Sequence, residues 1–352
     1  MAFQWDVLLL ETGFLAIFFA PWPLGREKPS PPPTVMLWLL RWLAFRLMFL
    51  SGLVKLTSGD PTWRNLTALQ FHYQTQPLPN PIAWYAHQLP ASVHKFACAG
   101  MFGIELLLPF FIFAPWRLVR AAAGTLLIAF QLAIVATGNY TFFNWLTIAL
   151  CLLVFGEYFP KPVWRREAPG ILLALALVPL SLIETAVRFR ADLPEWIEQP
   201  IGWAMPFHVV NSYGLFAVMT TTRPEIIVEG SHDGEQWAAY EFPHKPGDPR
   251  RAPTWVAPHQ PRLDWQMWFA ALSGPQRTPW FHRFVIRLLE GSPDVLRLLR
   301  NNPFPGRPPK YVRARLFEYR FTTPQERAAT KDWWYRTPRG SYFPPVSLKE
   351  RP

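Results

Sequence analysis

The residues best suited to chemistry lie in one polar segment, residues 51–95, between two apolar runs. This segment supplies a lysine, an aspartate, an arginine, histidines and polar aromatics. Such groups can transfer protons, pair with charged ligands or bind a lipid headgroup. We therefore expect the functional site here, in a candidate binding pocket lined by Lys55, Asp60, Trp63, Arg64, His72, Tyr73 and His87.

These residues carry no signature of a particular reaction. Neither a GxSxG string nor a glycine-rich phosphate loop occurs in the chain. His72, His87 and His94 lack zinc-site spacing, and Cys98 and Cys151 form no CxxC pair. The sequence therefore predicts no metal site and no cofactor. It identifies no catalytic residue and favours a non-enzymatic role, while an enzyme remains an open alternative.

A second set of charged residues lies inside the apolar runs. Glu11, Arg46 and Glu105 each fall near the middle of one run, where ionisable groups are costly and usually paired. A rise of about 1.5 Å per residue places all three near the midplane of a membrane. We therefore expect one intramembrane polar cluster, Glu11–Arg46–Glu105. It either holds helices in register or forms a proton or substrate site; the remaining alternative is that the three residues share a depth without contact.

Six apolar runs must position these residues, at about 3–20, 35–54, 96–115, 119–137, 142–159 and 170–187. Each is about long enough to cross a hydrocarbon core of roughly 30 Å. The later half has no such run, but shows strand-like segments at 211–222, 225–229, 236–242 and 311–322 and helical spacing between them. The predicted fold class is an α-helical polytopic membrane bundle of about six transmembrane helices, followed by a small β-rich α+β soluble domain.

The same patterns predict three parts of the chain. Residues 1–187 form the transmembrane helical domain, which includes a structured segment at 51–95. Residues 188–330 form the soluble α+β domain. Residues 331–352 form a tail that we expect to be partly disordered.

Basic residues in the connectors predict the orientation. Arg26 and Lys28 lie in the first connector, Arg117 in the third and Lys161 in the fifth. The positive-inside rule places these connectors in the cytoplasm. Residues 51–95 and 188–352 are then expected on the non-cytoplasmic side.

The net charge of +11 is spread over the chain rather than clustered, so we expect no nucleic-acid partner.

Three strings carry a family resemblance. They are SGLVKLTSGDPTWRNLTAL followed by HYQTQPLPNPIAWYAHQLP within 51–90, QWDVLLLETGFLAIFFAP at 4–21, and NNPFP with PPKYVRARLFEYRFTTP within 301–324. Through them the chain resembles the lipase maturation factor family of membrane proteins over most of its length. Such proteins usually carry another hydrophobic helix or two before the QWD segment, so the resemblance implies that this chain lacks them.

The resemblance implies an integral membrane maturation factor, a chaperone that assists exported proteins. Its partners would be the lipid bilayer and exported client proteins, lipases by family analogy. The family's membrane domain is also remotely similar to that of vitamin K-dependent carboxylases. The chain could therefore be, as an alternative, a membrane-embedded enzyme whose site joins residues 51–95 to the helix bundle.

The Arg-, Pro- and Ala-rich composition favours a bacterial inner membrane. In a eukaryote the expected location is the endoplasmic reticulum membrane.

Overall fold

The computed structural model describes residues 3–20, 32–156, 164–189 and 194–348. The chain forms two compact units, each assembled from separate stretches of sequence. The helical unit comprises Met1–Thr67, Lys95–Ile134 and Phe142–Met219, and the sheet unit comprises Ala68–His94, Val135–Thr141 and Thr220–Pro352. These boundaries differ from those expected at residues 187 and 330. Most of the 51–95 segment belongs with the sheet, and residues 188–219 belong with the helices.

The apolar runs form helices, as their length and composition predict. They are α1 (Gln4–Phe19), α2 (Thr34–Thr57), α6 (Ala91–Leu106) with η1 (Leu108–Phe113), α7 (Arg117–Thr137), α8 (Phe143–Leu152) with η2 (Leu153–Phe155), and α9 (Trp164–Arg188). Two short helices complete the unit, α3 (Pro61–Arg64) and α10 (Glu195–Ala204), the latter continuing into η3 (Met205–Phe207).

Four of the expected spans are long and apolar enough to cross a membrane, as judged over the described residues: Thr34–Thr57, Ala91–Phe113, Arg117–Thr137 and Glu167–Arg188. The other two, α1 with 16 residues and the helical stretch Phe143–Phe155, are shorter. Arg26, Lys28 and Lys161, on which the predicted orientation partly rests, lie outside the described residues.

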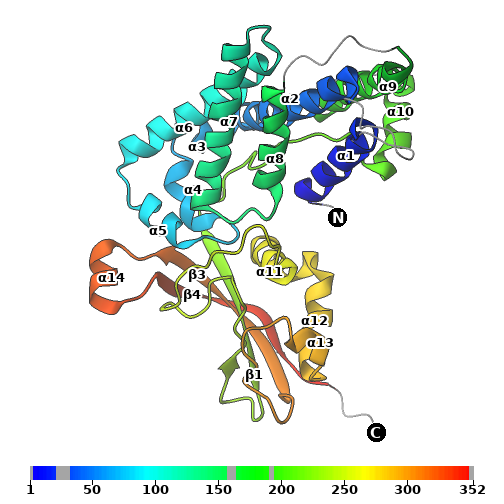
Figure 1. Ribbon diagram of the computed structural model, residues 1–352. Helices are drawn as coiled ribbons and strands as arrows, with labels where there is room; N and C mark the ends of the chain where they lie inside the picture. The colour runs from blue at the N-terminus through cyan, green and yellow to red at the C-terminus, as the bar shows by residue number, and fades with distance from the viewer. Residues whose placement is uncertain (1–2, 21–31, 157–163, 190–193, 349–352) are drawn as a thin grey trace, which may run out of the picture. The chain divides into compact units, whose positions relative to one another are not determined.

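Buried polar side chains join neighbouring helices of the helical unit. Asn144 of α8 donates a hydrogen bond to Oε1 of Gln131 on α7 at 2.7 Å, and these two helices run side by side (Figure 1). Glu167 near the start of α9 accepts hydrogen bonds from the backbone N–H groups of Thr34 and Val35 at 2.8 and 3.0 Å. Its carboxylate thereby satisfies the free N–H groups at the start of α2.

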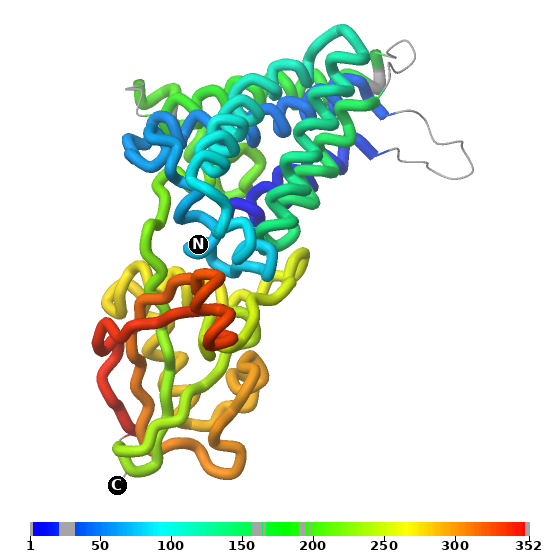
Figure 2. The backbone as a smooth tube through the Cα atoms, turned by 90° about the vertical axis from the view of Figure 1, so that its left-hand side faces the viewer, coloured from blue at the N-terminus to red at the C-terminus, as the bar shows by residue number. Residues whose placement is uncertain are grey.

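The sheet unit is built on four antiparallel strands. In the order β2-β1-β3-β4 they are β2 (Ala238–Ala239), β1 (Arg223–Ser231), β3 (Tyr311–Phe321) and β4 (Trp334–Val346). The three long strands run side by side in Figure 2. The helices of this unit are α4 (Leu69–Thr75), α5 (Pro81–His87), α11 (Arg262–Ser273), η4 (Pro275–Arg277), α12 (Pro279–Leu289), α13 (Pro293–Leu296) and α14 (Pro324–Thr330).

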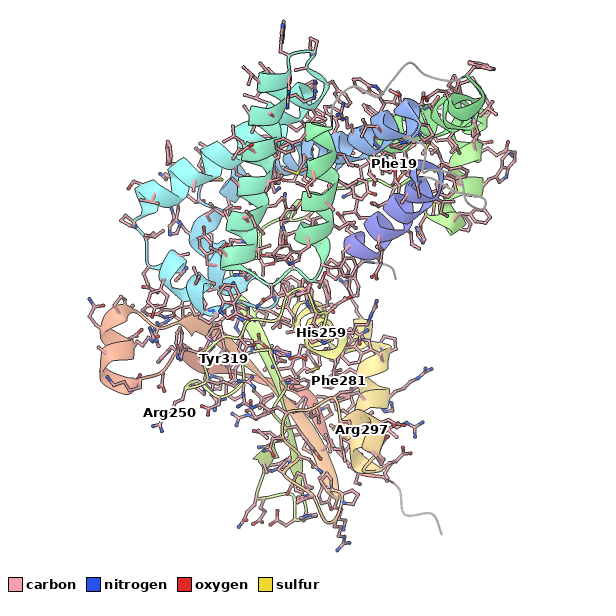
Figure 3. The ribbon with its side chains drawn as sticks, in the orientation of Figure 1. Phe19, Arg250, His259, Phe281, Arg297 and Tyr319 are labelled. Carbon is pink, nitrogen blue, oxygen red and sulfur yellow. The ribbon has the colours of Figure 1, made fainter. Side chains whose placement is uncertain are left out.

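Alternation along β3 gives the sheet two covered faces, because successive side chains of a strand point to opposite sides. Val312 and Ala314 belong to the larger core, which includes Phe281 of α12 between that helix and the strands (Figure 3). Phe317 and Tyr319 point to the other face and pack in a second core that includes Trp84 of α5. The first half of the chain thus supplies part of the core of the C-terminal sheet.

The segment predicted to be a partly disordered tail contains an ordered strand. Residues 334–346 form β4, which pairs with β3. Pro338, Pro344 and Pro345 argue against a central strand, but β4 is an edge strand of this sheet. An edge strand tolerates proline because half of its N–H groups need no partner strand. The last residues, 349–352, lie outside the described residues.

The predicted fold class is confirmed as a helical part followed by a small antiparallel α+β unit. One expected strand is absent from the sheet. Residues 211–222 precede β1, and the residues up to Met219 belong to the helical unit as irregular chain. We call residues 208–219 the strap.

Candidate functional site

The residues of the predicted binding pocket are divided between the two units. Lys55, Asp60, Trp63 and Arg64 lie in the helical unit, whereas His72, Tyr73 and His87 lie in the sheet unit. That all of them line one pocket stays a prediction. The structure defines the surroundings of each group within its own unit.

Lys55 forms a buried ion pair with Glu105. Its Nζ lies 2.7 Å from Oε2 of Glu105 and donates to the backbone oxygen of Ser51 at 3.1 Å. Gly52 permits the close approach of α2 and α6 that this pair needs, because a Cβ at Gly52 would lie 2.9 Å from Cβ of Glu105. Lys55 therefore bonds inside the helical unit instead of extending its ammonium group to the membrane edge.

The other two members of the predicted polar cluster, Glu11 and Arg46, contact each other. Arg46 also donates to the backbone oxygen of Asn211 at 3.1 Å. Asn211 Nδ2 and the Tyr213 hydroxyl donate to Oε2 of Glu11 at 3.0 and 2.8 Å. The structure thus corrects the expected three-residue set, because Glu105 bonds to Lys55 and not to Arg46. Equal depth in a membrane does not specify which helix faces meet.

Two pocket candidates also bind the strap. Asp60 accepts a hydrogen bond from the backbone N–H of Met219 at 2.6 Å, and Trp63 Nε1 donates to the backbone oxygen of Phe216 at 3.0 Å. Burial acts to raise the pKa of the Asp60 carboxyl, but the hydrogen bonds from Met219 and Thr62 outweigh it and hold this pKa below its usual value. Glu11, Arg46, Asp60 and Trp63 therefore share one role, which is to fix the strap.

Arg64 differs from its neighbours because it is exposed. It is the last residue of α3, and its side chain is exposed whereas Asp60 and Trp63 are buried. Among the pocket candidates of the helical unit, it is the residue that a partner outside the chain can reach.

In the sheet unit, His72 and Tyr73 belong to a network of hydrogen bonds and ring contacts. The hydroxyl of Tyr140 lies 3.0 Å from Nε2 of His72 and donates to Oε1 of Gln76 at 2.9 Å. The ring of Tyr73 lies 5.6 Å from that of His94, measured between centroids. Within the described residues no cluster of His, Cys, Asp and Glu has the arrangement of a metal site. The network ties α4 to the loop at 138–141, which follows α7.

His87 is the candidate with the most altered acidity. Its ring packs 5.7 Å from that of Phe321, and its buried Nδ1 has no hydrogen-bond partner. Burial, and secondarily the positive charge of His94, lowers the pKa of His87 to about 4. The neutral form is therefore the one that the fold accommodates.

This shift predicts an acid-sensitive sheet unit. An unfolded histidine takes up its proton near pH 6.5, whereas folded His87 does so only near pH 4. The free energy of unfolding is therefore undiminished above about pH 6.5 and falls as the pH approaches the folded-state pKa. At about pH 5 the loss is about 2 kcal/mol. Thermal unfolding of His87→Phe and of the wild-type chain against pH checks this. Equal pH dependence of the two would contradict it.

A buried charged triad was not foreseen from the sequence. Arg223 lies 2.8 Å from Oε1 of Glu225, and Lys245 Nζ lies 3.0 Å from Oε2 of the same carboxylate. Arg223 also donates to the backbone oxygens of Gln74 at 2.8 Å and Pro77 at 3.0 Å. The triad therefore attaches the connector between α4 and α5 to β1. In the sequence, the Arg-Pro-Glu string has the pattern of a turn. Its charged residues within an otherwise apolar strand are the one feature that could have indicated a buried charged site.

Two family models match this chain in sequence. The lipase maturation factor transmembrane domain matches residues 1–161, and the lipase maturation factor C-terminal domain matches residues 209–344. Lipase maturation factor 1 of Homo sapiens is 38% identical, with 99% of this chain and 67% of the relative covered. This chain belongs to the lipase maturation factor family. The resemblance carried by the three strings is thereby confirmed, and the chain is a membrane protein.

Other lipase maturation factors match over nearly the whole chain as well. Lipase maturation factor 2 of Xenopus laevis is 38% identical and that of Homo sapiens 35%, each with 66% of its own length covered. The chain thus spans 66% of the length of these curated relatives. No solved structure matches. These lipase maturation factors come from vertebrates, and they give no support to the expected bacterial inner membrane.

Proposed function

We propose that this chain is a membrane-bound maturation factor that assists exported client proteins, with lipases as the client class that its relatives' names indicate. The observation that carries the proposal is the match of both family models, in order, along one chain. In a eukaryotic cell the corresponding location is the endoplasmic reticulum membrane. The carboxylase-like alternative has no support from these relatives, and Lys55 of the 51–95 segment is bound in an ion pair with Glu105.

We further propose that the sheet unit and α3 lie on the non-cytoplasmic side, where exported clients fold. The basic connectors support this orientation through the positive-inside rule. In intact cells or sealed vesicles, Ser58→Cys and Ser273→Cys should react with an impermeant thiol reagent added from that side. Ser273 is exposed, whereas Ser231 in β1 is buried and would not report. Labelling only after lysis would overturn the orientation. The native Cys98 and Cys151 are buried and give a low background.

The client-binding surface that we propose is a patch of arginines and aromatics at α14. The Arg327 guanidinium lies 3.6 Å from the ring centre of Trp333 and also stacks near Tyr85, and Arg320 lies 4.3 Å from the ring centre of Tyr335. Tyr85 and Tyr335 are exposed. Arginine and large aromatics contribute most to binding at protein interfaces. Arg64 in the helical unit is a second candidate contact, because it too is exposed.

Single substitutions should separate client contacts from structural residues. We expect Tyr85→Ala, Tyr335→Ala and Arg64→Ala to lower client secretion severalfold at normal abundance, because each residue is exposed and truncating an interface residue that contributes to binding costs about 1 kcal/mol or more. Asp60→Ala should instead lower the abundance of the factor, because it removes the bond to Met219. Trp255→Ala, an exposed aromatic outside this patch, is the control. Secretion that follows abundance in all variants would contradict the proposed surface.

A further inference from the structure

The short helices α10 and η3 carry large apolar side chains that the described residues of the helical unit leave exposed. Trp196, Trp203 and Phe207 are 73%, 69% and 72% exposed, and Met205 is 60% exposed. The sequence from 199 to 207, QPIGWAMPF, contains no ionisable residue. A soluble surface rarely presents so many large apolar groups together. This segment therefore needs an apolar environment.

The strap fixes the depth of this segment in the membrane. Arg46 lies 12 residues after Thr34 and 11 before Thr57, the ends of the span α2. At about 1.5 Å per residue it is therefore near the middle of the span. Arg46 donates to the backbone oxygen of Asn211, and Glu11, near the middle of α1, binds the side chain of Asn211. Asn211 is thus held at about half the depth of the bilayer.

The chain between Asn211 and Phe207 is too short to leave the membrane. Four residues span at most about 14 Å, and half of a hydrocarbon core of about 30 Å is about 15 Å. Phe207 therefore remains within the apolar layer. Residues 196–207 are helical, so they extend only about another 18 Å. Trp203 and Trp196 then fall between the layer and the interface, where tryptophan is favoured.

The irregular backbone of the strap is hydrogen-bonded to side chains of the helical unit. Irregular chain inside a membrane is tolerated only where protein groups satisfy its N–H and C=O groups. Gln4 on α1 both accepts from the N–H of Gly214 at 3.1 Å and donates to its oxygen at 3.2 Å. Trp63 and Asp60 bind the backbone of Phe216 and Met219. The polar side chains of the helical unit are thus directed at this backbone.

We propose that α10, η3 and the strap form a re-entrant element of the membrane domain. Helices α10 and η3 insert their aromatic face among the acyl chains of one leaflet, and the strap returns along α2 toward its Thr57 end. The occupant of the exposed face is lipid hydrocarbon, in continuity with the span α9, whose Leu172 and Leu175 are also exposed. Lipid contact thereby extends beyond the four long spans.

Nitroxide labels in the full chain, reconstituted in phosphatidylcholine vesicles, test this. Labels at Phe207→Cys and Met205→Cys should show several-fold higher accessibility to oxygen than to a water-soluble nickel chelate, as at Leu175→Cys on α9. Ser273→Cys, in the sheet unit, should show the reverse. Both tested side chains are exposed, so their replacement removes little packing. A Phe207 label with the nickel accessibility of Ser273 would overturn the proposal. Low accessibility to both reagents would mean a protein partner and would also overturn it.

Discussion

Arg223→Ala is expected to destabilise the sheet unit by about 3–5 kcal/mol, because it removes one of the two cations that bind the buried Glu225 carboxylate and breaks a buried charged network. Arg223, Glu225 and Lys245 are almost fully buried. Burial lowers the pKa of Arg223, and the charge of Glu225 acts against this. The substitution also removes the donors to the backbone oxygens of Gln74 and Pro77. The α4–α5 connector should therefore detach from β1.

The measurement is thermal unfolding of the full chain in detergent, with limited proteolysis of the 68–94 segment. Arg250→Ala is the matched control, since the Arg250 side chain is 80% exposed and its ion pair with Asp332 is 3.7 Å long. An exposed pair of this kind contributes little. If Arg223→Ala and Arg250→Ala unfold at the same temperature, the triad does not hold this connector.

Arg46→Ala is expected to destabilise the helical unit by a similar amount, about 3–5 kcal/mol. It leaves the Glu11 carboxylate without its cation and Asn211 without a donor to its backbone oxygen. Because Asn211 and Tyr213 are bonded to Glu11, the strap should loosen with the ion pair. Arg46→Lys should retain part of the stability, since it keeps the charge and loses the forked geometry.

The readouts are the unfolding temperature in detergent and protease cleavage within residues 208–219. Lys95→Ala, an exposed basic residue in the same unit, is the control. Wild-type protection of the strap in Arg46→Ala would show that the strap is held without this pair. Loss of protection in Arg46→Ala but not in Lys95→Ala would support the arrangement described above.

Local patterns in the sequence predicted several helices, a helix cap, one strand and the family of this protein. Long apolar runs predict helices because a membrane leaves no other partner for their backbone, and four of them reach spanning length within the described residues. The Ser58-Gly-Asp-Pro turn predicts a helix cap at Asp60 or Ser58, and the structure shows it at Asp60. The alternation along 311–322 predicts the strand that the structure shows as β3. The family strings predict the lipase maturation factor family. Each of these signals depends on neighbours in the chain.

Tertiary structure decided which distant groups meet. Depth alone assigns Glu11, Arg46 and Glu105 to one level, but contact depends on how each helix is rotated and how closely it approaches. Gly52 allows α6 to bring Glu105 to Lys55, and the strap occupies the remaining polar groups beside Arg46. The prolines of β4 read locally as disorder, yet they are tolerated because an edge strand leaves half of its N–H groups unpaired. Such outcomes depend on the packing of segments far apart in sequence, which local composition does not encode.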